Sequence, residues 1–184
     1  MTAKSMCSPL PWSRLAGWGL FAVAFGVTEA VVAFYIRRTG GMTPGLDYAQ
    51  VWAARGLPFT SATIEAELRR AGFWRAEQAR EAGTLLLLAG AAWGGGRNGR
   101  ERLGLFLFTF ALWDLAYYAA LPFVVGFPQS LADTDVYFLV PFAWYGPVWL
   151  PVLVVMPALL ALSLWLLRRA PGRCSRKGAK EQRV

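Results

Sequence analysis

Histidine is absent from this 184-residue chain, and cysteine occurs only twice, as Cys7 and Cys174. Without imidazole the chain cannot form bis-histidine haem ligation, a histidine-bound zinc or copper site, or a catalytic triad with histidine as the base. The cysteines form no C-x-x-C pair, so we expect no thiol exchange. Both lie in end segments that are expected on the reducing, cytoplasmic side, so we expect no structural disulfide. The sequence predicts no cofactor and no bound metal.

Charge is also scarce, because charged residues make up 16% of the chain and hydrophobic residues 56%. A soluble domain of this size would have too little polar surface. The formal net charge of +8 comes mostly from basic residues that flank apolar runs, where anionic lipid headgroups and membrane topology explain them. We therefore predict the lipid bilayer, and not nucleic acid, as the partner of these residues.

Long apolar runs predict an all-α integral membrane protein, a bundle of four transmembrane helices. About 20 residues at about 1.5 Å per residue cross a hydrocarbon core of roughly 30 Å. The expected spans are residues 15–36, 78–96, 103–125 and 147–167, within a membrane domain of residues 15–168. The second span is the shortest, and charged residues at its start are expected to stand in the interface.

The last apolar stretch, residues 136–167, contains four prolines, each of which removes a backbone donor and disturbs the preceding helical turn. We interpret residues 136–146 as a bent interfacial or re-entrant segment. Residues 147–167 then form a proline-kinked fourth span.

Lysine and arginine are distributed unequally between the two sides of such a bundle. Twelve lysines and arginines lie in the N-terminal segment 1–14, in the second loop, and in the basic tail 169–184 together with residue 168. Residues 126–135 contain none. The positive-inside rule predicts a bacterial cytoplasmic (inner) membrane protein with both termini in the cytoplasm. Residues 39–75 form a long extracytoplasmic loop with two short helical patterns, and an apolar stripe there is expected to cap the bundle.

Two acids, Glu29 and Asp114, interrupt the first and third spans. An ionisable group at that depth costs about 3 kcal/mol or more unless it faces protein, water or a partner. Gly26 and other small residues spaced by three or four place Glu29 toward a neighbouring helix. We expect the acids of three helices to converge in the outer half of the bundle. The candidate pocket residues are Thr28, Glu29, Glu77, Arg80, Glu81, Thr84, Asp114, Tyr117, Tyr118, Asp135, Trp144 and Tyr145.

Three span acids against Arg80 alone leave an excess of negative charge, which proton uptake or a bound cation would relieve. The predicted function is to bind or transport a cation, a proton or an amphiphile, or to serve as an accessory subunit beside other membrane proteins. One alternative is a lipid-modifying enzyme with Glu29 or Asp114 as general acid or base. Another is a structural subunit whose acids only lock the helices together. The aromatic residues near the third loop form an interfacial belt or a wall that stacks on an organic cation.

Overall fold

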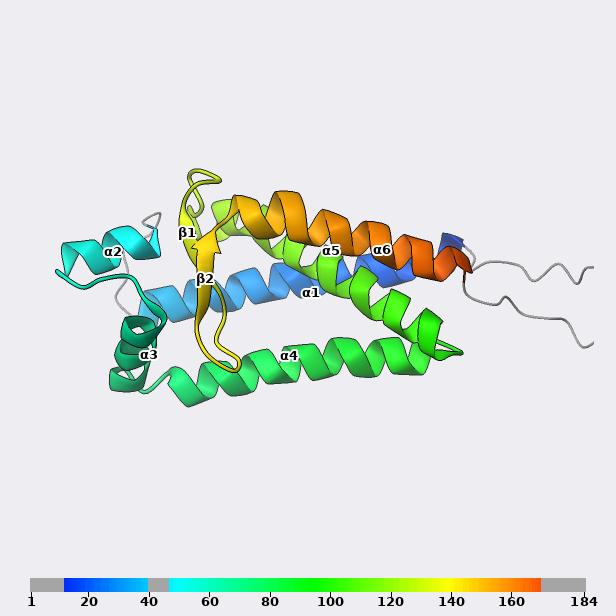
Figure 1. Cartoon of the computed structure of the whole chain (residues 1–184), viewed down its shortest axis with the longest axis horizontal. Helices are drawn as coiled ribbons and strands as arrows, with labels where there is room; N and C mark the ends of the chain where they lie inside the picture. Colours follow the sequence, from blue (N-terminus) through cyan, green and yellow to red (C-terminus); the bar gives the residue numbers. More distant parts are fainter. Residues whose placement is uncertain (1–11, 40–46, 170–184) are drawn as a thin grey trace, which may run out of the picture.

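The computed structural model describes residues 12–39 and 47–169. The expectations for Cys7, Cys174, residues 1–11 and the tail from residue 170 lie outside the described residues. The described part is mostly helical, and its long helices run along one axis (Figure 1). Its helices are α1 (Trp12–Thr39), α2 (Tyr48–Ala54), α3 (Ser61–Arg70), α4 (Trp74–Gly95), α5 (Gly99–Val125), the π-helical η1 (Leu150–Val155) and α6 (Met156–Arg169).

Three helical segments are long and apolar enough to cross a membrane: Trp12–Thr39, Gly99–Val125 and Leu150–Arg169. This confirms the prediction of a helical, membrane-embedded protein. The helix α4 has 22 residues but is not among the three. Charged side chains in its first turns, such as Arg80 and Glu81, lower its hydropathy.

Helix α5 is the centre of the packing, and its ends follow from its sequence. The side chain of Asn98 accepts a hydrogen bond from the Glu101 amide at 2.9 Å, and the helix ends at Gly126, which has a φ of 74°. A Cβ atom at Gly26 of α1 would overlap the carbonyl of Trp113 and lie 2.8 Å from Ala116 Cβ. The small-residue stripe therefore brings α1 against α5 as predicted, and it places Glu29 beside the segment that carries Asp114.

Residues 136–146, expected to be a bent interfacial or re-entrant segment, form most of a β-hairpin. Its strands β1 (Thr134–Phe138) and β2 (Trp144–Pro147) pair antiparallel, with Asp135 opposite Gly146. β-Branched and aromatic residues such as Val136, Tyr137 and Phe138 favour a strand here, and Pro141 lies in the connection between the strands. The fold is thus helical with one small sheet, and the last helical segment begins at Leu150 with a π-helical turn instead of at residue 147.

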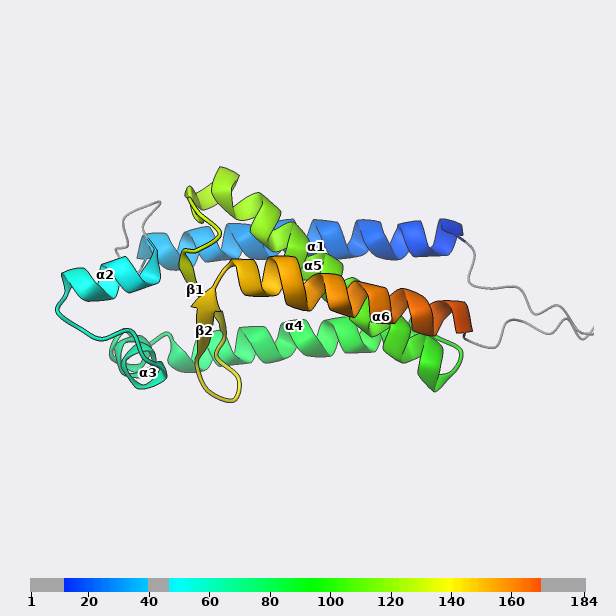
Figure 2. The ribbon, with the colours of Figure 1, turned by 45° about the horizontal axis from the view of Figure 1, so that its top comes forward.

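The hairpin crosses the long helices from the α5 and α6 side toward α4, at the end of the bundle that also carries α2 and α3 (Figures 1 and 2). Residues 39–75 do contain the two short helices that the sequence predicts. Ile64 of α3 is 1% exposed and packs with Trp74, Leu139 and Ala143, so the apolar stripe faces the start of α4 and the hairpin. The side chain of Asp47 joins α2 to β1, because it accepts hydrogen bonds from Gln50 N and Thr134 N.

Candidate functional site

A cavity of about 110 Å³ lies beneath the hairpin, between α1, α4 and α5. Carboxylates from three helices and from β1 line it. They are Glu29 of α1, Glu77 and Glu81 of α4, Asp114 of α5 and Asp135 of β1. The acids that the sequence analysis expects to converge therefore share one cavity, although the fifth arrives on a strand.

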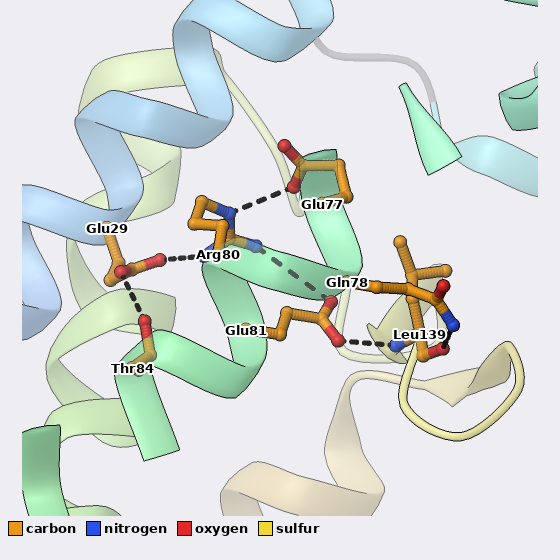
Figure 3. A network of polar contacts seen from close by, with 7 residues as sticks. All are labelled: Glu29, Glu77, Gln78, Arg80, Glu81, Thr84 and Leu139. Atoms are coloured by element: carbon orange, nitrogen blue, oxygen red, sulfur yellow. Dashed lines mark hydrogen bonds and ion pairs between the residues drawn. The ribbon is translucent and has the colours of Figure 1, made fainter. Parts of the chain in front are cut away.

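Arg80 organises one side of this cavity, which we call the glutamate cluster: Glu29, Glu77, Arg80, Glu81 and Thr84 (Figure 3). The guanidinium pairs with the Glu29 carboxylate, donates from Nε to Glu77 Oε2 at 2.9 Å, and lies 3.9 Å from Glu81 Oε1. The Thr84 hydroxyl donates to Glu29 Oε1 at 3.0 Å. Both carboxylate oxygens of Glu29 are therefore engaged.

The same cluster holds the hairpin against α4. The backbone amide of Leu139 donates to Glu81 Oε2 at 2.6 Å, and the Gln78 side chain donates to the Leu139 carbonyl at 3.0 Å (Figure 3). Leu139 itself is 5% exposed. Two side chains of α4 thus satisfy both backbone polar groups of a buried residue in the connection between the strands.

Tyr48, Asp114, Tyr118 and Asp135 line the other side of the cavity, and Arg37, which is not a lining residue, pairs with Asp135 behind them. We call these five residues the aspartate cluster. The Arg37 guanidinium lies 3.7 Å from Asp135 Oδ1 and 4.5 Å from the centre of the Tyr48 ring. The Tyr118 hydroxyl donates to Asp135 Oδ2 at 3.1 Å. The Asp135 side chain is therefore bound at both oxygens.

Burial governs the ionisation of the groups that lie outside the membrane-spanning segments. It raises the pKa of Asp135 to about 6, against the opposing effects of Arg37 and Tyr118. Burial also raises the pKa of the Tyr48 phenol, and the adjacent Arg37 only partly offsets this. Asp135 consequently changes its protonation at a higher pH than an exposed aspartate does.

Asp114 differs from the other acids of the cavity. Its side chain is buried, with the residue 7% exposed, and its Oδ2 atom has no hydrogen-bond partner within residues 12–39 and 47–169. No ion pair to Asp114 is found among these residues either, whereas Arg80 and Arg37 engage the neighbouring acids. In the same part of the chain, no three carboxylate or thiol side chains lie close enough to hold a metal ion.

Three candidate residues lie outside the cavity. Thr28 lies about 100° around α1 from Glu29, so its side chain is exposed instead of facing the cavity. Its hydroxyl donates to the Ala24 carbonyl one turn earlier. Trp144 and Tyr145 are 49% and 39% exposed. They lie on β2, where Trp144 packs against Phe142 and Tyr145 against Phe59, neither of which lines the cavity. The other nine candidates line the cavity: Glu29, Glu77, Arg80, Glu81, Thr84, Asp114, Tyr117, Tyr118 and Asp135.

The sequence analysis did not select Arg37, Tyr48, Trp113 or Tyr137 as site residues. Arg37 lies eight residues after Glu29, on the same face of α1 and two turns closer to the C-terminal end of the helix, and this spacing could have identified it. Tyr48 reaches the cavity only through the fold of the outer loop, which no local pattern reveals.

No protein-family model, no curated protein and no solved structure matches this chain. The chemistry of the site therefore has to be argued from its own residues.

Proposed function

We propose that this chain is a small multi-pass protein of a bacterial cytoplasmic membrane that binds a proton or a small cation in an outward-facing carboxylate cavity. The observation that carries the proposal is Asp114, a buried acid of α5 that lines the cavity with one oxygen unpartnered among the described residues. A buried carboxylate oxygen without a hydrogen-bond partner is costly, and a bound proton or cation relieves that cost.

The charge balance of the cavity supports a positively charged ligand. With every group ionised, the five carboxylates of the cavity are balanced by two guanidiniums, that of Arg80 in the lining and that of Arg37 paired with Asp135, which leaves three excess negative charges. Buried charges are tolerated when they are paired, and unpaired ones take up a proton or bind a counter-ion. Asp114 is the acid of this set that no described cation neutralises.

The size of the cavity restricts the ligand. A volume of about 110 Å³ holds about four water molecules at roughly 30 Å³ each. Drug-sized molecules occupy pockets of roughly 300 Å³ or more. The proposal is therefore a proton with bound water, or a small cation, and an amphiphile could place only its headgroup here.

The orientation is part of the same proposal, with α4 as a fourth span. After Glu81, α4 is uncharged to its end, and it runs beside the other long helices (Figures 1 and 2). Its charged side chains Glu77, Arg80 and Glu81 line the cavity. With four crossings, the basic start of α5 and the two chain ends lie in the cytoplasm, and the cavity opens on the outer side.

A structural subunit is the second candidate, and the glutamate cluster favours it. Arg80 pairs with Glu29, and Thr84 binds the other oxygen of the same carboxylate. Such a closed set of contacts fixes the register of α1 against α4 without any ligand. On this alternative, Asp114 would have no binding role.

Infrared titration of the purified protein in detergent tests the proposal. The carboxylic-acid carbonyl band should include a component that disappears in Asp114→Asn and persists in Glu65→Gln, a matched change on the surface of α3. A titration that is identical in wild type and Asp114→Asn would contradict proton uptake by Asp114. Co-purification in mild detergent then separates a freestanding protein from an accessory subunit.

A further inference from the structure

The wall around Asp114 is aromatic. Trp113, Tyr117, Tyr118, Tyr137 and Phe138 all line the same cavity. The ring of Trp113 is held between neighbours, with its centre 5.6 Å from that of Phe110 and 6.4 Å from that of Phe138. Aromatic faces attract cations, and the attraction is strongest where water is excluded.

Two hydroxyl groups of this wall are already used. The Tyr118 hydroxyl donates to Asp135, and the Tyr137 hydroxyl donates to the Pro147 carbonyl at 2.7 Å. The carboxylate oxygens of Glu29, Glu81 and Asp135 are likewise engaged. Around Asp114 the cavity therefore offers aromatic side chains, one carboxylate oxygen without a partner among the described residues, and the Trp113 Nε1–H group, which is a donor and so adds no acceptor.

The groups available around Asp114 suit some classes of cation better than others. A hard metal ion takes about six oxygen ligands, and a primary ammonium needs acceptors for three N–H groups. A methylated ammonium needs neither, because its methyl groups contact aromatic faces while its charge is balanced by one carboxylate. Arg37 does not oppose such a ligand strongly, since Asp135 balances its charge.

The volume limits the ligand to a small one. An apolar cavity of about 150 Å³ admits benzene. The cavity beside Asp114, with a volume of about 110 Å³, is smaller than that, so it has room for a single small cationic group and not for a ring system.

We infer that the cation bound beside Asp114 is a small methylated ammonium ion, held by the Asp114 carboxylate and by the aromatic wall that includes Trp113. This inference rests on the proposed function, and it names the ligand class of the same cavity.

Calorimetric titration of the full chain in detergent with tetramethylammonium chloride tests the inference. Sodium chloride controls for ionic strength, methylammonium for charge without methyl substitution, and tert-butanol for a neutral molecule of the same shape. Tetramethylammonium should bind at least about tenfold more tightly than tert-butanol and more tightly than methylammonium. Either of these compounds binding as tightly as tetramethylammonium would overturn the inference.

Substitutions test which residues bind tetramethylammonium. Asp114→Asn and Trp113→Leu should each weaken tetramethylammonium binding about tenfold, and Trp113→Phe, which keeps a ring, should retain most of it. Trp149→Leu is the matched control, because Trp149 is 43% exposed and is not among the cavity-lining residues. Gel filtration checks that each variant is folded. Binding that survives Asp114→Asn unchanged would overturn the inference.

The two proposals fail in different ways. If tetramethylammonium does not bind while the infrared band of Asp114 still titrates, the inference about the ligand falls and the proposed proton uptake stands. If ligand binding and the Asp114 band are both absent, both fall.

Discussion

The two sides of the cavity differ in how their buried carboxylates are paired. In the glutamate cluster, Arg80 lies among three carboxylates, and Thr84 and the Leu139 amide bind the oxygens that the guanidinium leaves. In the aspartate cluster, Arg37 and Tyr118 both bind Asp135, and Asp114 receives neither. The comparison teaches that convergent acids do not by themselves make a binding site, because one set can be consumed by internal contacts.

The partners of the two clusters explain this difference. Arg80 belongs to the same helix as Glu77 and Glu81, so the spacing of α4 ensures their contact. Arg37 lies in the last turn of α1, and Asp135 pairs with it from the hairpin. Asp114 lies deeper on α5, where the described neighbours contribute aromatic rings instead of a cation. We therefore assign stability to the glutamate cluster and ligand binding to Asp114.

The largest effect is expected from Arg80→Met. The substitution leaves Glu29, Glu77 and Glu81 close together without their cation, and it should lower the free energy of unfolding by about 3 kcal/mol, the low end for a broken buried pair because the Arg80 side chain is 30% exposed. Thermal unfolding in detergent measures this. Arg70→Met, which removes the exposed pair between Arg70 and Glu67, should change it by less than about 1 kcal/mol. Equal effects of the two substitutions would show that the glutamate cluster does not stabilise the fold more than a surface ion pair does.

A smaller effect is expected from Glu81→Ala. This change leaves the buried Leu139 amide without its acceptor, which costs about 2 kcal/mol. Hydrogen exchange at Leu139 should accelerate more than exchange in α5. Glu65→Ala, on the surface of α3, is the control. Unchanged protection at Leu139 would show that Glu81 does not hold the hairpin.

Asp135 provides a pH test of the aspartate cluster. Its pKa is raised from 3.8 to about 6, so the folded protein binds more protons than the unfolded chain in this window, and the contribution of Asp135 to stability is lost as pH rises through it. Between pH 5 and pH 7 the loss is about 1 kcal/mol. Asp135→Asn should remove this pH dependence from the unfolding curve. A slope that survives the substitution would assign it to another group.

Much of the membrane architecture could be predicted from composition and periodicity. The apolar runs that predict residues 15–36 and 103–125 coincide with α1 and α5, because length and hydropathy are properties of the run itself. The hairpin could not be predicted in this way. An uncharged stretch with four prolines is compatible with a broken helix or with strands, and only its pairing across Pro141 decides between them.

The candidate site was predictable to the extent that helical spacing determines it. Glu77, Arg80, Glu81 and Thr84 share one face of α4, so their joint presence in the cavity follows from sequence. The contacts across elements do not follow from sequence. The Leu139 amide and the ring of Tyr48 depend on where the hairpin and α2 pack. Trp144 was misplaced because residues 136–146 were expected to be a bent or re-entrant segment, whereas Trp144 begins a β-strand.

The sharpest test of the comparison is one chemical change made on both sides of the cavity, and the smallest effect on stability is expected from its Asp114 member. Glu29→Gln removes a carboxylate that Arg80 and Thr84 both engage, and the guanidinium loses part of its counter-charge. It should destabilise the protein clearly, by about 1–3 kcal/mol.

Asp114→Asn removes a carboxylate whose Oδ2 is unpartnered within the described chain. The relief of a buried charge and the cost of a new unpaired amide donor oppose each other, so the free energy of unfolding should stay within about 1 kcal/mol of the wild type. Thermal unfolding of the two variants in the same detergent makes the comparison directly. If Asp114→Asn destabilises as much as Glu29→Gln, Asp114 is a structural contact like the glutamates, and the division of the cavity into a stabilising side and a binding side fails.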